Sequence, residues 1–266
     1  MDISADLACS AVSSAVGLIP ALSAMQLSIP VDGTTNLLMI LRWVHFIAGI
    51  AWVGLLYFFN LVSTPLFREL DPAVRGKVFP GLMSRTLWWF RWASVVTVFV
   101  GIWYWMKIVG TDARNAEESP GTAIWTFFAI WTLAFVIYMG VLMATHKKSS
   151  AGWFVGIAAV VVVIAASYLY VTLNSHGWES NRLLAIGVGG GMGWFMMFNV
   201  WGVVWRVQKR LIQWTAANAA QGTPMPAQAA DYARLSLLAA RTNFWLSFPM
   251  LFFMGAASHY PMFVGR

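Results

Sequence analysis

The sequence predicts an all-α integral membrane protein, a polytopic bundle of about six transmembrane helices. Of its 266 residues, 59% are hydrophobic and only 10% are charged, whereas soluble domains carry roughly 25% charge. The apolar residues are gathered in runs that are long enough to cross a hydrocarbon layer of about 30 Å. A surface of this composition suits lipid, and the length is taken up by one membrane domain.

Six apolar stretches pass the length test for a membrane span. We expect them at residues 37–63, 87–109, 122–145, 152–173, 183–206 and 242–264. Residues 1–35 are weakly apolar and are expected at the interface or on the outer side, before a six-helix membrane domain at 36–266. The connection at 207–241 contains glycine and prolines before an Ala/Leu-rich run, which predicts a cytoplasmic turn and a short surface helix.

Lysine and arginine residues predict the orientation of the bundle, because connections rich and poor in them alternate. The first connection has four basic residues, Arg68, Arg75, Lys77 and Arg85. The second has only Arg114 and the fourth only Arg182, whereas the third and fifth are again basic. Cytoplasmic loops carry the excess of Lys and Arg. We therefore expect the odd-numbered connections in the cytoplasm and both termini on the outer, periplasmic side.

The composition also argues against several classes of function. The net charge of +7 comes from short basic clusters between apolar spans, which does not match the continuous basic face of a nucleic-acid-binding domain. The single cysteine, Cys9, excludes an internal disulfide, a Cys-rich metal site and the C-x-x-C-H attachment of c-type haem in this sequence. No Asp or Glu lies within an expected span, which disfavours a carboxylate proton relay. Histidine is the remaining metal-ligand type.

Two histidines lie at matching depths in the first and last expected spans. His45 is about eight residues into the first span, roughly 12 Å below the outer boundary at 1.5 Å per residue. His259 is about five residues from the end of the last span, roughly 8 Å below the same boundary, because that helix runs the other way. Toward the bilayer centre, Gly49 and Gly255 each lie four residues away, on the face of the neighbouring histidine.

This arrangement predicts one b-type haem with His45 and His259 as axial iron ligands, because two imidazoles saturate the iron for electron transfer. Arg42 is within one turn of His45 and can meet an anionic group. Trp43 and Trp52 share the same helix and can pack against a macrocycle. The alternative is that both histidines are hydrogen-bonded core residues whose small neighbours serve helix packing, and that the tryptophans belong to an aromatic belt.

Other conspicuous residues favour structural interpretations. Glycines inside the fifth expected span indicate close helix approach, although a flat cofactor can also lie there; they are Gly187, Gly189, Gly190, Gly191 and Gly193. His146 adjoins two lysines and is interpreted as a cap at an inner helix end. His176 is interpreted as a residue of an outer loop, with a ligand or docking contact as the alternative.

Three segments of the sequence carry a family resemblance. They are RWVHFIAGIAWVG at residues 42–54, the stretch at 199–209, and a closing pair, FPMLF at 248–252 and SHYP at 258–261. Together they resemble the membrane domain of bacterial urate hydroxylases, the urate oxidase N-terminal family. The segments run from the first expected span to the last, and two of them contain His45 and His259.

The resemblance implies a multi-pass protein of the bacterial inner membrane that passes electrons outward as an oxidoreductase. Full-length family members carry a C-terminal cytochrome c domain, and this sequence contains no C-x-x-C-H. We therefore expect the electron acceptor to be a separate outer-face c-type cytochrome or a subunit of a respiratory complex. Two other functions stay open, a structural or assembly subunit of such a complex and a urate-oxidising enzyme. No catalytic residue is assigned.

Overall fold

The computed structural model describes residues 30–263, and every regular element in that range is a helix. Six helices in the described range are long and apolar enough to cross a membrane. This confirms the predicted all-α polytopic fold. Most of the N-terminal segment predicted at 1–35 lies outside the described residues, and the orientation of the termini stays a prediction.

Two compact units divide the chain, residues 1–39 and 40–266. In the first, Asp32 caps the helix that begins at Gly33, because its carboxylate accepts hydrogen bonds from the Thr34 and Thr35 backbone N–H groups and from the Thr35 hydroxyl. These hydrogen bonds, led by the one from the hydroxyl, hold the pKa of Asp32 below its ordinary value. The membrane bundle belongs to the second unit.

The membrane helices are of two kinds, uninterrupted and interrupted by a short π-helix. The uninterrupted helices are α4 (Pro72–Asn115), α5 (Gly121–Thr145), α6 (Ala151–Leu173) and α9 (Ala229–Ala256). The interrupted ones are α2 (Gly33–Tyr57), η1 (Phe58–Ser63) and α3 (Thr64–Glu69), and then α7 (Asn181–Asn199), η2 (Val200–Val204) and α8 (Trp205–Gln221). The first five expected spans all fall inside these segments.

The wide turn of η1 frees backbone carbonyls, and nearby side chains bind them. Asn60 donates from Nδ2 to the Leu56 carbonyl at 2.9 Å, and the Thr64 hydroxyl donates to the Phe59 carbonyl at 2.7 Å. Within a membrane such groups have no water to bind, so they need partners from the protein itself. The sequence therefore supplies a polar residue within and directly after this π-helix.

The last expected span, 242–264, was wrong at its C-terminal end. Helix α9 ends at Ala256. Pro261 disfavours helical backbone at the residue before it, and the side chain of Asn181 forms hydrogen bonds with four backbone groups of the segment after the helix. These contacts satisfy groups that a longer helix would have paired internally. His259 consequently lies in a turn beyond the helix and is exposed.

The connection expected at 207–241 is mostly helical. Helix α8 continues from the fifth span and ends where Gly222 adopts a left-handed conformation with φ of 68°. The expected surface helix is the first part of α9, which starts at Ala229 and runs into the last span without a break. Gln208 of α8 donates to the Ser236 hydroxyl of α9 at 2.8 Å and joins the two helices.

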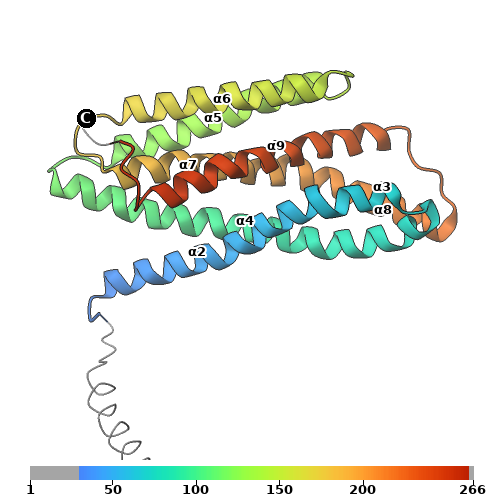
Figure 1. Cartoon of the computed structure of the whole chain (residues 1–266), viewed down its shortest axis with the longest axis horizontal. Helices are drawn as coiled ribbons and strands as arrows, with labels where there is room; N and C mark the ends of the chain where they lie inside the picture. The colour runs from blue at the N-terminus through green and yellow to red at the C-terminus, as the bar shows by residue number, and fades with distance from the viewer. Residues whose placement is uncertain (1–29, 264–266) are drawn as a thin grey trace, which may run out of the picture. The chain divides into compact units, whose positions relative to one another are not determined.

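Helix α7 is the central element of the bundle, and Figure 1 shows it with α9 between the α5–α6 pair and α4. Its most apolar window is 78% buried, against 22–50% in the other spans. A Cβ atom at Gly187 would lie 2.1 Å from the Tyr170 hydroxyl, and one at Gly191 would lie 1.9 Å from the Trp131 ring. The predicted packing role of the glycine cluster is therefore confirmed for these two positions.

We predict that Gly191→Ala destabilises the bundle, because the fully buried Trp131 ring must move to admit the methyl group. Overpacking of this kind costs about 1–3 kcal/mol. Thermal unfolding of the purified protein in detergent, followed by circular dichroism, should show a lower midpoint. The matched control is Gly140→Ala in α5, where the added Cβ meets nothing within 4 Å. Equal midpoints for the two variants would contradict this account of α7.

Candidate functional site

A cavity of about 510 Å³ lies between α2, α4, α7 and α9. The part of α2 in the second unit makes only sparse close approaches to the other helices, so its inner face borders open space. Apolar side chains form most of the walls, together with glycines from three helices. These glycines are Gly49, Gly54, Gly101, Gly189, Gly190 and Gly193. At the deep end, the hydroxyl groups of Tyr57 and Ser247 are hydrogen-bonded at 3.1 Å and join α2 to α9.

Among the described residues, His45 is the one histidine that lines the cavity. Its Nδ1 atom lies 2.8 Å from the backbone carbonyl oxygen of Thr97 on α4. The imidazole rests against Gly101, where a Cβ atom would come within 2.7 Å of Cε1 and 2.8 Å of Nδ1. The close approach of this side chain to α4 therefore requires glycine at position 101.

The hydrogen bond to Thr97 determines which nitrogen of His45 carries the proton. A carbonyl oxygen only accepts, so Nδ1 must donate, and in a neutral imidazole Nε2 then keeps its lone pair. Nε2 has no hydrogen-bond partner within residues 30–263, yet it is not among the nitrogen atoms that the fold shuts off from solvent. An accessible, unprotonated ring nitrogen thus remains at the cavity wall.

At the end of the cavity where α7 begins, Arg42 of α2 and Arg182 of α7 lie against Tyr104 of α4. Nη2 of Arg42 donates to the Tyr104 hydroxyl at 2.6 Å. The Cζ atoms of Arg42 and Arg182 lie 5.4 Å and 5.2 Å from the centroid of the Tyr104 ring. We call this end, which Arg42 and Ser258 line, the mouth of the cavity.

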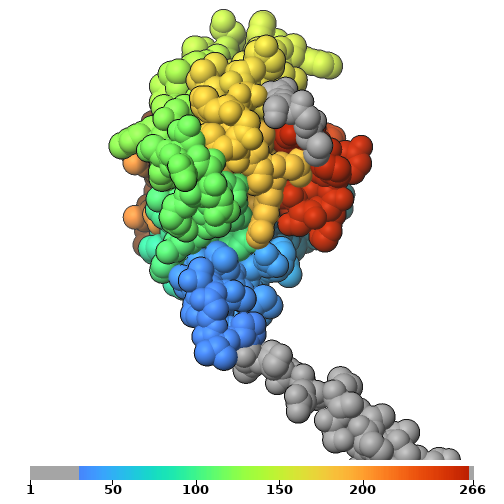
Figure 2. Space-filling model, turned by 90° about the vertical axis from the view of Figure 1, so that its left-hand side faces the viewer, coloured from blue at the N-terminus to red at the C-terminus, as the bar shows by residue number. Residues whose placement is uncertain are grey.

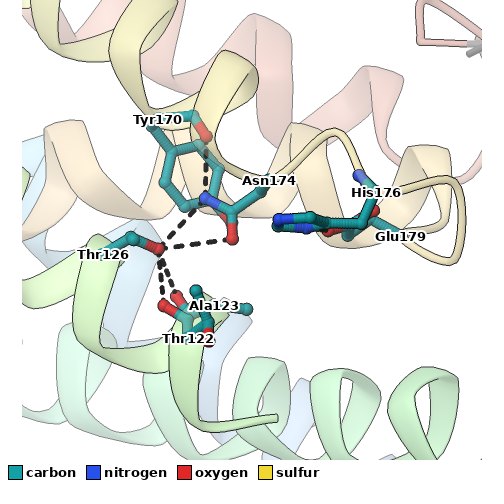
Figure 3. Close-up of polar contacts among 7 residues, drawn as sticks. All are labelled: Thr122, Ala123, Thr126, Tyr170, Asn174, His176 and Glu179. Carbon is teal, nitrogen blue, oxygen red and sulfur yellow. Dashed lines mark hydrogen bonds and ion pairs between the residues drawn. The ribbon is translucent and has the colours of Figure 1, made fainter. Parts of the chain in front are cut away.

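Polar contacts with α5 and α6, and within the loop itself, hold the loop between α6 and α7 in place (Figure 3). Asn174, which is fully buried, donates from Nδ2 to the Tyr170 carbonyl at 2.7 Å and to the Thr126 hydroxyl at 3.1 Å. The Nδ1 atom of His176 lies 2.7 Å from the Glu179 carboxylate, which also accepts the His176 backbone N–H at 3.0 Å. His176 is therefore a loop residue hydrogen-bonded to Glu179, and its alternative role as a ligand stays a prediction.

The start of α7 is tied to α4, and this places Arg182 beside Tyr104. The Ser180 hydroxyl donates to the Asp112 carboxylate at 2.5 Å and accepts the Leu183 N–H at 3.2 Å as the helix N-cap. Figure 2 shows this end of the bundle, with the start of α7 (yellow to orange) between the end of α4 (green) and the end of α9 (red). Residues from three helices thus meet around the mouth.

The structure brings some of the predicted site residues together and leaves others apart. Those that line the cavity are Arg42, His45, Gly49 and Trp52, and those that do not are Trp43, Gly255 and His259. Trp43 is 60% exposed, as expected for a residue of an aromatic belt at the membrane interface. Gly255 has no atom within 4 Å of an added Cβ. The role of His259 as an iron ligand stays a prediction.

Several residues of the site were not found from the sequence. Arg182 was counted only as a marker of topology, although its place directly before the glycine-rich helix was a usable signal. Tyr104 and Gly101 lie on one face of α4 by their spacing of three residues, but nothing in the sequence pairs them with α2. The Thr97 carbonyl is a backbone group and leaves no signal. His146 is the C-cap residue of α5, as predicted.

Comparison with known protein families gives a match to the family described as urate oxidase N-terminal, over residues 72–266. The chain belongs to the urate oxidase N-terminal family. The matched range is more than two thirds of the chain and runs from the start of α4 through α9, so this family domain includes Gly101, Tyr104 and Arg182. Arg42 and His45 precede it. Neither curated proteins nor solved structures give a match.

We predict that Gly101→Ala in this urate oxidase N-terminal family protein breaks the hydrogen bond between His45 and Thr97. The added Cβ would overlap the imidazole, so the ring must leave the carbonyl. Nuclear magnetic resonance of histidine labelled with ¹⁵N should show a slowly exchanging Nδ1 proton in the wild type and lose it in the variant. Gly54→Ala, in the same cavity but with no atom within 4 Å, should keep it.

Proposed function

We propose that this member of the urate oxidase N-terminal family is a membrane-embedded b-type haem protein of the bacterial inner membrane. It passes electrons to a c-type cytochrome at the outer face, and His45 is an axial ligand of its haem iron. The observation that carries the proposal is the His45 imidazole, which is fixed through Nδ1 to the Thr97 carbonyl and leaves Nε2 accessible at the wall of an apolar cavity.

The ligand geometry supports the proposal. Histidines that bind metals almost always donate their other ring N–H to a carbonyl or carboxylate, which fixes the tautomer and the ring orientation. The bond from His45 to Thr97 has this form, and Gly101 provides the space for it. No group of three or more His, Cys, Asp or Glu residues with metal-site geometry occurs in the described part of the chain. A single imidazole suits haem, whose porphyrin supplies the other nitrogen ligands.

The shape and chemistry of the cavity also fit a flat apolar group. Its volume of about 510 Å³ lies within the range of roughly 300–1,000 Å³ for small-molecule and cofactor sites. Gly190 and Gly193 bring the α7 backbone to the cavity wall, and Gly49 does the same on α2 beside His45. Gly189 also lines the cavity, but an added Cβ there would lie 3.0 Å from Phe253 of α9. Large apolar residues line most of the rest of the cavity, which favours an apolar macrocycle over a hydrated ligand.

The second axial ligand is predicted to be His259. It follows Ser258, the last of the described residues to line the cavity, and its own side chain is exposed, so the turn would have to move to bring the imidazole inward. Met250 and Met254 of α9 already line the cavity and carry thioether sulfur atoms. A His–Met pair is also an established form of haem ligation and raises the reduction potential. The absorption spectrum of the haem-loaded protein therefore distinguishes His259 from a methionine as the second ligand.

Haem bound here would supply one-electron transfer, and the residues of the protein would hold and orient it. The Thr97 carbonyl makes Nδ1 a donor and keeps the His45 ring from turning. The bond between Tyr57 and Ser247 joins α2 to α9 at the end of the cavity away from the arginines. The predicted orientation of the bundle puts the opposite end on the outer side, toward a soluble cytochrome.

We predict that His45→Ala removes the Soret band and the pyridine haemochrome spectrum of protein expressed with haem supplied, because the iron loses its fixed ligand. His259→Ala should shift or remove the band if His259 is the second ligand, and leave it unchanged if a methionine is. His146→Ala, at the distant end of α5, is the matched control and should retain haem in full. Haem-free wild-type protein would refute the proposal.

Family membership favours a second candidate function, the oxidation of urate. We predict that purified wild-type protein with an artificial one-electron acceptor either consumes urate in a His45-dependent manner or does not consume it at all. Uric acid loss at its ultraviolet absorption band measures this directly. Urate turnover that persists in the His45→Ala variant would show that urate oxidation does not depend on haem bound at His45. If His45→Ala and His259→Ala both assemble like the wild type and keep their function without haem, the structural-subunit alternative is supported instead.

A further inference from the structure

The two arginines at the mouth are close enough to repel each other. Arg42 and Arg182 lie on the same tyrosine, 5.4 Å and 5.2 Å from the Tyr104 ring centroid, so their Cζ atoms are at most about 11 Å apart. That distance is near one Debye length in dilute salt, roughly 10 Å at 0.1 M. Screening is weaker still beside an apolar cavity. Holding both charges here is unfavourable unless an anion shares the site.

The described residues provide no such anion. The ion pairs within residues 30–263 are Lys147 with Asp231 and His176 with Glu179, and neither involves these arginines. Arg42 forms a side-chain hydrogen bond only with the neutral phenol of Tyr104.

Arg182 forms no side-chain hydrogen bond with any described residue. Its Nε atom is shut off from solvent without a partner. Its two Nη atoms are not shut off, and Arg182 lines the cavity. The two free ends of this guanidinium are therefore available to a ligand in the cavity.

We propose that Arg42 and Arg182 form a binding site for the carboxylate groups of the cavity's cofactor. This inference rests on the proposed function, because haem b carries two propionate groups on one edge of its ring. A guanidinium binds a carboxylate through two parallel N–H···O hydrogen bonds, and two guanidiniums match two carboxylates. The N-terminus of α7, where Arg182 lies, adds the positive end of a helix dipole.

The position of the arginine pair also fixes how the ring enters. Arg42 precedes His45 by three residues on α2, so the two lie on one face, about 4.5 Å apart along the helix axis. An iron ligand and a carboxylate ligand at this spacing would point the propionate edge toward the mouth. The apolar edge would then point toward Tyr57, at the other end of the cavity.

Removing the charge from the ligand tests the proposal directly. The full chain, purified without haem and placed in lipid nanodiscs, is titrated with haem b and with haem b dimethyl ester, and the Soret absorbance is followed. The wild type should bind haem b at least about tenfold more tightly than the diester, as expected for charge-assisted hydrogen bonds. Arg42→Gln combined with Arg182→Gln should lower this ratio to about one while leaving diester affinity unchanged.

The diester titration also reports on folding, because a misfolded variant would lose affinity for both porphyrins. Lys107→Gln is the matched charge control. Lys107 is exposed on α4, three residues beyond Tyr104, and does not line the cavity. Its variant should keep the wild-type ratio, which excludes a general effect of net charge at this end of the bundle.

The outcomes distinguish this inference from the proposed function. A wild type that binds neither porphyrin refutes the haem function. A wild type that binds both equally, or a double variant that keeps the tenfold ratio, overturns the carboxylate site alone. A final arm titrates the haem-free chain with urate and follows tryptophan fluorescence. Urate binding that needs both arginines, together with equal porphyrin affinities, would assign the pair to a free anion and overturn the proposal.

Discussion

The hydrogen bond between the His45 imidazole and the Thr97 carbonyl is the constraint on which the arrangement of the cavity depends. A polar side chain inside a membrane has no water to bind and must find its partner in the protein. The partner of His45 is the Thr97 carbonyl on α4, which the imidazole reaches across Gly101. The part of α2 in the second unit makes few other close approaches to the bundle. The bond therefore holds α2 against the bundle locally and leaves open space beside it.

Helix α7 explains how such a space coexists with a well-packed bundle. Gly187 and Gly191 face α6 and α5, where the Tyr170 and Trp131 rings occupy the room that side chains would take. Gly190 and Gly193 line the cavity. One helix thus uses the same residue type for two opposite purposes. On one side the missing side chains allow contact, and on the other side they leave a flat wall.

Much of this arrangement could be predicted from the sequence, and the remainder has identifiable physical causes. The membrane fold could be predicted because composition and the length of the apolar runs determine the spans. His45 could be predicted as a site residue because an imidazole within an apolar run is conspicuous. His259 was misplaced because contacts from Asn181, far away in the sequence, help to end α9. The pairing of Arg182 with Tyr104 depends on the loop closed by Ser180 and Asp112, a tertiary contact with no local signal.

The π-helix η1 has a consequence for the extent of the cavity along α2. A π-turn inserts an extra residue, which rotates the positions beyond it by about 100° relative to an uninterrupted α-helix. On α2 the cavity ends at Tyr57, the residue directly before this rotation, and the hydroxyl bond to Ser247 spans the gap there. Phe46 and Ile50, which also line the cavity, are exposed as Arg42 is, so the cavity borders the surface along α2 and is not confined to one opening. The π-helix thus marks where α2 stops contributing to the cavity wall, and an apolar ligand has access to the cavity from the side of α2 as well as past Arg42.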